Sequence, residues 1–234
     1  MRRADLAMGG ALAAAVAWAT LLPGADLAVA AWFFDPASGQ FPLGQQPLLY
    51  AGYRAVSLAA PVLLGALVLL LLASWLPRPA WARRLRWPAA FLLASLLIGP
   101  GVLTHNVLKD HWGRARPHQI VEFGGTRHFT PALQPAHECA RNCAFASGHA
   151  AFAFFSMAFA FVLPSRLRRR ALVAGFLFGA YIGFVRLAQG GHFLSDVIFS
   201  FFTGFGPAWL LYRGYFERRL AVPIAVPPAP TFAR

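Results

Sequence analysis

Long uncharged apolar runs constrain the fold of this chain more than any other feature of its sequence. Three of them cover residues 6–25, 58–76 and 87–108, and a helix of about 20 residues crosses about 30 Å of hydrocarbon. Three shorter runs cover residues 150–164, 171–185 and 197–212, and each needs a polar end to complete a span. The sequence therefore predicts an all-α integral membrane protein, a bundle of six transmembrane helices.

The composition agrees with a membrane protein and excludes several other classes. Hydrophobic residues make up 58% and charged residues 12% of the chain, against about 45–50% and about 25% in a soluble domain. So apolar a chain is not intrinsically disordered, and two cysteines exclude a disulfide-rich scaffold. The net charge of +13 would suggest nucleic-acid binding in a soluble protein. Because the positive charges lie at the ends of apolar runs, we expect no nucleic-acid partner.

The basic residues are distributed unequally between the two sides of the predicted membrane. Numbering the runs one to six places the amino terminus, residues 77–86, residues 165–170 and the carboxyl tail on one side, with 14 of the 21 Lys and Arg residues. The positive-inside rule assigns this side to the cytoplasm, together with both termini. The segments 105–149 and 186–196 then face the outside, and all seven histidines fall between His105 and His192.

The two ends of the chain carry separate predictions. Residues 1–220 are predicted to form one membrane domain, and the Pro-rich residues 221–234 a disordered cytoplasmic tail. Two arginines before the first run and Ala28-Val29-Ala30 after it also fit a cleavable signal peptide. We favour a first span followed by a short amphipathic helix at the outer interface, over residues 24–34 with Asp26 and Asp35.

Lys109 and Arg116 follow the third apolar run in the sequence Lys-Asp-His-Trp-Gly-Arg-Ala-Arg-Pro. If the third helix continues beyond the membrane, the two residues share one face about two turns apart. Two cations on one face can hold a dianion. By itself the pair also fits ordinary contact with lipid headgroups.

A second polar cluster, Ser147-Gly148-His149, begins the fourth run. Ser147 is a suitable helix N-cap, and the free N–H groups of a helix start bind phosphate readily. Gly148 allows a ligand to approach the backbone closely. A cap followed by an interfacial histidine is the alternative reading.

A third cluster connects the fifth and sixth runs. Arg186 ends the fifth run, and His192 and Asp196 are one helical turn apart at the start of the sixth. This spacing allows the carboxylate to orient the imidazole and leave its other nitrogen free to attack. A structural salt bridge uses the same spacing.

Cys139 and Cys143 lie in the outer segment, just before Ser147. In an oxidising compartment they would form a disulfide bond that braces this loop. Two free thiols are the alternative, because a separation of four residues satisfies bridge geometry only in some backbone conformations.

The motifs Lys-x6-Arg-Pro, Ser-Gly-His and Arg-x5-His-x3-Asp, in this order and on one predicted membrane face, resemble the type 2 phosphatidic acid phosphatase (PAP2) superfamily. The resemblance covers residues 109–196. It departs at Ala146, where many members have Pro, and at Val185, where many have Ser. Residues 113–117, 123–125 and 143–149 are most similar to bacterial lipid A 1-phosphatases. Undecaprenyl diphosphate and phosphatidylglycerophosphate phosphatases share the same catalytic residues and are the alternatives.

The resemblance implies a phosphoric monoester hydrolase of the bacterial inner membrane, with a lipid phosphate as substrate and a periplasmic active site. His192 would attack phosphorus to form a phosphohistidine, Asp196 would orient it, and His149 would serve as general acid and then as general base. The residues that would bind the phosphoryl oxygens are Lys109, Arg116, Ser147, Gly148 and Arg186. No metal and no other cofactor is required.

The same residues allow three other interpretations. A metal site would draw on His105, His111, His118, His149, His192 and Asp196, but the neighbouring cations would repel a divalent ion. A transporter would need a polar path at the bilayer midplane, where these runs are uncharged. Vanadium haloperoxidases share the anion-binding motifs but are soluble. Finally, His118, Arg127 and His128 are candidate contacts for the substrate headgroup, or solvated loop residues.

Overall fold

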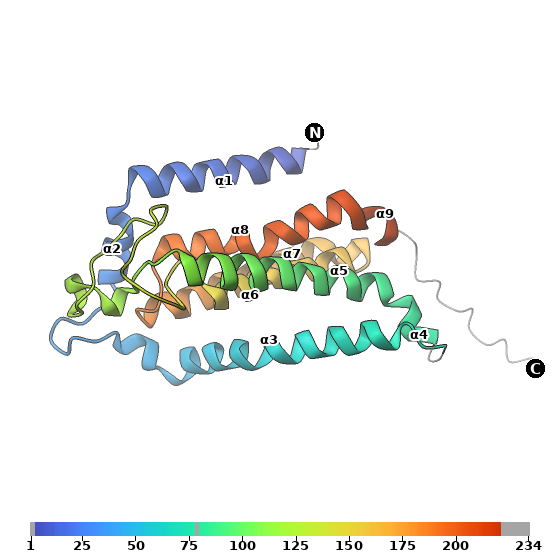
Figure 1. The fold of residues 1–234 in the computed structure, drawn as a ribbon, viewed down its shortest axis with the longest axis horizontal. Coiled ribbons are helices and arrows are strands. Elements are labelled where there is room, and N and C mark those ends of the chain that lie inside the picture. Colours follow the sequence, from blue (N-terminus) through green and yellow to red (C-terminus); the bar gives the residue numbers. More distant parts are fainter. Residues whose placement is uncertain (1–2, 78–79, 221–234) are drawn as a thin grey trace, which may run out of the picture.

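The computed structural model describes residues 3–77 and 80–220, so the predicted tail over residues 221–234 lies outside it. The described residues form a bundle of helices that lie along one axis, without a β-strand (Figure 1). The long segments are α1 (Arg3–Leu21), α3 (Pro47–Ala73), α5 (Arg86–Leu96) with η2 (Leu97–Lys109), α6 (Gly148–Phe155) with η5 (Ser156–Phe161), α7 (Ser165–Ala188), and α8 (Leu194–Leu211) with η6 (Tyr212–Phe216) and α9 (Glu217–Leu220). The short segments are α2 (Gly24–Ala31), η1 (Pro42–Gln45), α4 (Ala80–Arg84), η3 (Pro117–Gln119) and η4 (Val121–Phe123).

Five helical segments in the described part of the chain are long and apolar enough to cross a membrane, where the sequence predicts six. They cover residues 3–21, 47–73, 86–109, 165–188 and 194–220. The predicted fourth span instead forms the shorter apolar segment Gly148–Phe161. Its α6 part packs against both α7 and α8, and residues 150–155 are all buried. Because other helices enclose it, the length required of a lipid-facing span does not apply to α6.

Glycines on α7 and α8 allow α6, α7 and α8 to pack closely against one another. A Cβ atom on Gly179 would lie 2.1 Å from the Phe154 ring, and one on Gly183 would lie 2.3 Å from Val197. On α8, a Cβ atom on Gly204 would lie 2.2 Å from the Ala151 carbonyl oxygen. The repeat of Gly175, Gly179 and Gly183 predicts a smooth ridge for close helix packing, and the structure confirms it.

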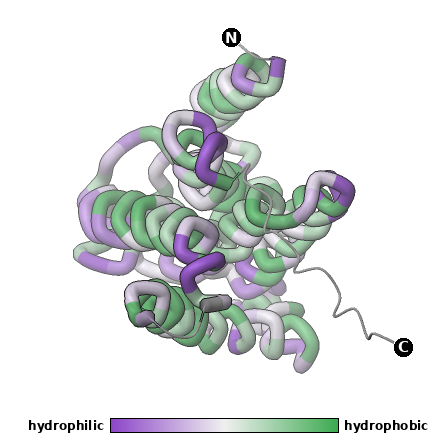
Figure 2. The backbone as a smooth tube through the Cα atoms, turned by 90° about the vertical axis from the view of Figure 1, so that its right-hand side faces the viewer, coloured by the Kyte–Doolittle hydropathy of each residue, from purple (hydrophilic) through white to green (hydrophobic). Residues whose placement is uncertain are grey.

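The connecting segments are unequal at the two ends of the bundle. At one end, hereafter the site end, α2 lies together with residues 32–46 and the long segment 110–147 (left in Figure 1). The opposite end carries α4 and α9. Figure 2 is viewed from that opposite end and shows α1 at the edge of the bundle. There Arg213 Nη2 of η6 lies 2.8 Å from Asp5 Oδ2 of α1, an ion pair that ties the two segments together.

The predicted amphipathic helix over residues 24–34 forms as α2, but it does not present its charge to solvent. Asp26 is only 3% exposed, and α2 packs against α8. The side chain therefore points into the protein, where a carboxylate needs hydrogen-bond donors to compensate for lost hydration.

Segment 110–147 is held in shape by contacts between its own residues. Trp112 Nε1 donates a hydrogen bond of 2.7 Å to the Ala132 carbonyl. Gly113 has a φ of +72°, and a Cβ atom there would lie 1.7 Å from the Ala136 carbonyl oxygen, so only glycine fits. Cys139 and Cys143 are joined by a disulfide bond, with Cα atoms 5.6 Å apart.

Candidate active site

His192 lies in the connection between α7 and α8 and is only 2% exposed. Its Nδ1 atom lies 2.7 Å from the Ala144 carbonyl oxygen, and because a carbonyl only accepts, Nδ1 carries the proton and the lone pair is on Nε2. Burial lowers the pKa of His192 well below its ordinary value, and repulsion from Lys109, Arg186 and Arg116 lowers it further. The imidazole is therefore neutral at neutral pH and has a nucleophilic nitrogen.

Asp196 lies beside His192, but the expected hydrogen bond between them is replaced. Asp196 Oδ2 is 3.6 Å from His192 Nδ1, and the Nδ1–H donates its hydrogen bond to the Ala144 carbonyl instead. The carboxylate instead accepts a hydrogen bond of 2.8 Å from the Phe193 N–H and one of 2.6 Å from Arg114 Nη1. The Asp196 carboxylate therefore lies near the His192 ring without accepting its hydrogen bond.

Lys109 and Arg116 do not share a helix face, so that part of the prediction is wrong. The helix ends soon after Lys109, Gly113 turns the chain, and Arg116 is in extended backbone with φ of −86° and ψ of 157°. The two side chains converge by another route. Lys109 Nζ donates a hydrogen bond of 2.7 Å to the Cys143 carbonyl, and Arg116 Nη2 one of 2.8 Å to the Asn142 carbonyl.

Arg186 is the third cation of the site and is 7% exposed. It hydrogen-bonds Gln189 Oε1 and lies over the Tyr53 ring, with Cζ 5.0 Å from its centroid. Within the described part of the chain, its Nε–H is buried and has no hydrogen-bond partner. A bound anion would satisfy this donor.

Ser147 and Gly148 begin α6 as the sequence predicts. The Ser147 hydroxyl accepts a hydrogen bond from the Ala150 N–H at 3.5 Å, which makes it the N-cap. A Cβ atom on Gly148 would lie 2.8 Å from His105 Nε2 and 3.6 Å from Lys109 Cδ. The start of α6 therefore lies directly beside Lys109.

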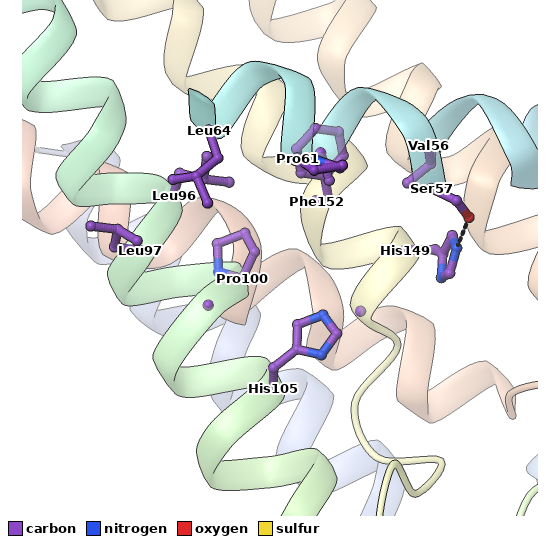
Figure 3. Close-up of a pocket in the computed structure, with 13 residues that line it drawn as sticks. Val56, Ser57, Pro61, Leu64, Leu96, Leu97, Pro100, His105, His149 and Phe152 are labelled. Carbon is purple, nitrogen blue, oxygen red and sulfur yellow. Dashed lines mark hydrogen bonds between the residues drawn. The ribbon is translucent and has the colours of Figure 1, made fainter. Parts of the chain in front are cut away.

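His149 faces α3, which contributes two residues that sequence reasoning missed. His149 Nε2 is 3.0 Å from the Ser57 hydroxyl, and its ring stacks on Tyr53 with centroids 4.5 Å apart. Figure 3 shows the pair of His149 and Ser57. Tyr53 and Ser57 both precede the apolar run that starts at residue 58, so hydropathy alone does not place them at a site.

Two cavities adjoin this stacked pair of Tyr53 and His149. One, of about 480 Å³, is largely apolar and lies between α3, α5, η2 and α6, with Ser57, His105 and His149 at its polar end (Figure 3). The other, of about 610 Å³ and hereafter the polar cavity, is the more polar of the two, and Tyr53, Arg116, His118 and Arg186 are among its lining residues. The site therefore adjoins both an apolar space and a polar one.

The remaining sequence candidates separate into two groups. His118 belongs to the site, since it lines the polar cavity and its Nδ1 atom lies 2.8 Å from the Gly190 carbonyl oxygen. Arg127 and His128 are exposed and line neither cavity. Among the described residues, no three His, Cys, Asp or Glu side chains are grouped so as to hold a metal ion.

Arg114 is a further residue of the candidate site that the sequence did not indicate. Its side chain is fully buried and makes ion pairs with Asp26 at 2.8 Å and with Asp196 at 2.6 Å. Its sequence signal is its place two residues before Arg116, and that of Asp26 is a lone acid after a long apolar run. Neither feature of the sequence indicates that Arg114 and Asp26 are partners.

Comparison with known proteins finds a matching family and several relatives. The family model described as PAP2 superfamily matches residues 88–220. A lipid A 4'-phosphatase of Francisella tularensis subsp. novicida (strain U112) is 30% identical over 201 residues, which cover 85% of this chain and 90% of the relative. Lipid A 4'-phosphatases of Rhizobium leguminosarum and Rhizobium etli are 40% and 41% identical, covering 47% and 45% of this chain and 48% and 41% of the relatives. No solved structure matches the chain.

The match extends over the segments that hold His149, Arg186, His192 and Asp196. Together with the relatives, it indicates a phosphoric monoester hydrolase that acts on a lipid phosphate. This chain belongs to the PAP2 superfamily.

Proposed function

We propose that the protein is a metal-independent lipid A phosphatase that works through a phosphohistidine at residue 192. The observation that supports this most strongly is the surroundings of His192. A buried, neutral imidazole with its lone pair on Nε2 lies close enough to Lys109, Arg116 and Arg186 to be affected by their charges. A phosphate monoester repels nucleophiles by its own negative charge, so neutralising that charge is the main task of such a site.

In the first step, the phosphoryl oxygens bind to the three cations and to the start of α6. His192 Nε2 forms a bond to phosphorus as the bond from phosphorus to the lipid oxygen breaks. His149 donates a proton to that leaving oxygen. The imidazole of His192 becomes positively charged, and Asp196, 3.6 Å from Nδ1, stabilises the charge.

In the second step, water replaces the lipid. Having lost its proton, His149 takes one from the water, whose oxygen attacks phosphorus while the bond between Nε2 and phosphorus breaks. Inorganic phosphate leaves, and His192 is neutral again. The Ser57 hydroxyl lies 3.0 Å from His149 Nε2 and holds the ring in place. In each step this hydroxyl must either move away from Nε2 or relay the proton.

The two cavities favour a substrate that has acyl chains as well as a large polar headgroup. The apolar cavity beside His149 suits a hydrocarbon chain, and the polar cavity beside Arg116 and Arg186 suits a phosphorylated sugar. Lipid A has both parts. The three relatives are named for lipid A as well.

We infer further that the 4'-phosphate is removed rather than the 1-phosphate. The sequence motifs resemble lipid A 1-phosphatases, whereas the relatives are named 4'-phosphatases. The relative from Francisella supports the 4' position more strongly, because its similarity extends over 85% of this chain instead of short motifs alone.

For the membrane arrangement we propose the bacterial inner membrane, with the site end in the periplasm and both termini in the cytoplasm. The distribution of Lys and Arg supports this orientation. In this arrangement Gly148–Phe161 is a sixth, enclosed crossing, and α2 lies at the periplasmic end.

The proposed substrate is tested with purified protein in detergent and lipid A carrying a single phosphate, at either the 1 or the 4' position. We expect release from the 4' compound to be faster by at least about tenfold, with EDTA causing no loss. Undecaprenyl diphosphate, phosphatidylglycerophosphate and phosphatidate complete the panel. Faster release from the 1 compound would reverse the positional assignment, and activity restored only by added Zn²⁺ or Mg²⁺ would contradict the metal-independent mechanism.

A further inference from the structure

Next to His192, a buried ionic network connects α2 to the start of α8. The guanidinium of Arg114 is fully buried. Its Nη1 atom donates to Asp196 Oδ1 at 2.6 Å and to the Ser195 hydroxyl at 2.9 Å, and its Nη2 atom donates to Asp26 Oδ2 at 2.8 Å. Its Nε–H donates a hydrogen bond of 2.8 Å to the Thr130 carbonyl. Arg114 thus joins two carboxylates that are far apart in the sequence.

Both carboxylate oxygens of Asp26 accept hydrogen bonds from members of this network. Its Oδ1 atom accepts a hydrogen bond of 2.8 Å from the Ser195 N–H, and its Oδ2 atom accepts one of 2.5 Å from the Ser195 hydroxyl. Ser195 and Asp196 are fully buried and adjacent in the chain. Asp26 therefore fixes the backbone and the side chain immediately before Asp196. It also lies outside residues 88–220, the part that the family model matches.

The charges of the network do not cancel. Two carboxylates face one guanidinium, so the sum is one negative charge, in surroundings where charges are weakly screened. Without Asp26, Arg114 would neutralise Asp196 completely. With Asp26 present, the guanidinium is shared, and Asp196 keeps negative charge 3.6 Å from His192 Nδ1.

This remaining charge matters most when His192 becomes positively charged in the phosphoenzyme. The Ala144 carbonyl at Nδ1 supplies only a dipole. The nearby Lys109, Arg116 and Arg186 oppose a positive imidazole, whereas the carboxylate of Asp196 beside Nδ1 favours it.

We propose that Asp26 is a positioning residue of the reaction. Through Arg114 and Ser195 it holds Asp196 in place and leaves it negatively charged, and so it stabilises the phosphorylated form of His192. The inference rests on the proposed phosphohistidine mechanism. A purely structural role, fastening α2 to the bundle, would instead lower the stability and leave turnover per folded molecule unchanged.

The test compares Asp26→Asn with the wild-type protein in detergent, using lipid A as substrate and orthovanadate and inorganic phosphate as ligands. Vanadate bonds to the nucleophile, whereas phosphate needs only the cations. We expect kcat and vanadate affinity to fall by about 10- to 100-fold, with KM and phosphate affinity changed less than about threefold. Asp26→Glu, which keeps the charge, should recover most of both losses.

Asp5→Asn is the matched control, because it removes the same charge from an ion pair with Arg213 at the opposite end of the bundle. Its kcat should equal that of the wild type. Unchanged kcat and vanadate affinity in folded Asp26→Asn would overturn the proposal, as would an Asp26→Glu variant as impaired as the Asn variant. A wild-type protein that releases no phosphate would instead refute the proposed function itself.

Ser195→Ala tests the same network without removing a charge, and it decides the matter if Asp26→Asn does not fold. Losing the hydroxyl removes one hydrogen bond to Asp26 and one from Arg114. We expect kcat to fall by about 3- to 10-fold with KM unchanged. The control is Ser95→Ala, another fully buried serine, whose hydroxyl donates to Phe91 O within α5. Equal kcat values for the two variants would overturn the proposal.

Discussion

His192→Ala is expected to reduce phosphate release from lipid A by at least about 10⁴-fold. The variant lacks the nitrogen that forms the bond to phosphorus, while Lys109, Arg116 and Arg186 remain to bind the phosphate. Affinity for inorganic phosphate should therefore change little, and kcat should account for the loss. Release of phosphate in a detergent assay measures kcat, and equilibrium binding of labelled phosphate measures the affinity.

A matched control for this prediction is His137→Ala. His137 is exposed and lines neither cavity beside the site, so its loss should leave kcat and KM at the wild-type values. If His192→Ala kept more than about one hundredth of the wild-type kcat, another group would have to be the nucleophile.

Arg114→Met is expected to lower the free energy of unfolding by about 3–5 kcal/mol and to abolish activity. The methionine fills much of the same volume, but it leaves the buried carboxylates of Asp26 and Asp196 without their common partner. Removing one member of a buried ionic network exposes the full cost of burying the others. Thermal unfolding in detergent, with circular dichroism as the signal, measures the loss.

The comparison for Arg114 is Arg213→Met, which breaks the pair with Asp5. That pair is 20% and 28% exposed, so its loss should cost about 1 kcal/mol or less. Similar losses in the two variants would show that the buried network contributes no more to stability than a partly exposed pair, contrary to the cost expected for two buried carboxylates without Arg114.

The sequence predicts the helical class and most of the helix positions because apolar length is a local property. The predicted fourth span forms the short apolar segment Gly148–Phe161, whose α6 part is enclosed by α7 and α8, so it does not reach the length of the five other apolar helices. The predicted apolar run also starts later than α3 does. The first turns after Pro47 include Tyr53 and Arg54 and are not uniformly apolar. Enclosure by other helices is a tertiary property that hydropathy does not contain.

The candidate site shows the same division between local and non-local information. The Ser147 cap was predictable because capping involves residues three apart. The partner of His192 was not, since the Ala144 carbonyl is 48 positions away and a backbone group has no sequence signal. The pairing of Asp26 with Arg114, 88 positions apart, likewise depends on how α2 lies against segment 110–147.

The most direct test of the account is to identify the residue that carries phosphate during turnover. Lipid A labelled with ³²P at the scissile phosphate is mixed with the wild-type protein, and the reaction is stopped within one turnover in alkali, where phosphohistidine survives. We predict acid-labile label on the peptide that contains His192 and none in the His192→Ala variant. Label on a different residue, or turnover without any labelled protein intermediate, would contradict the mechanism.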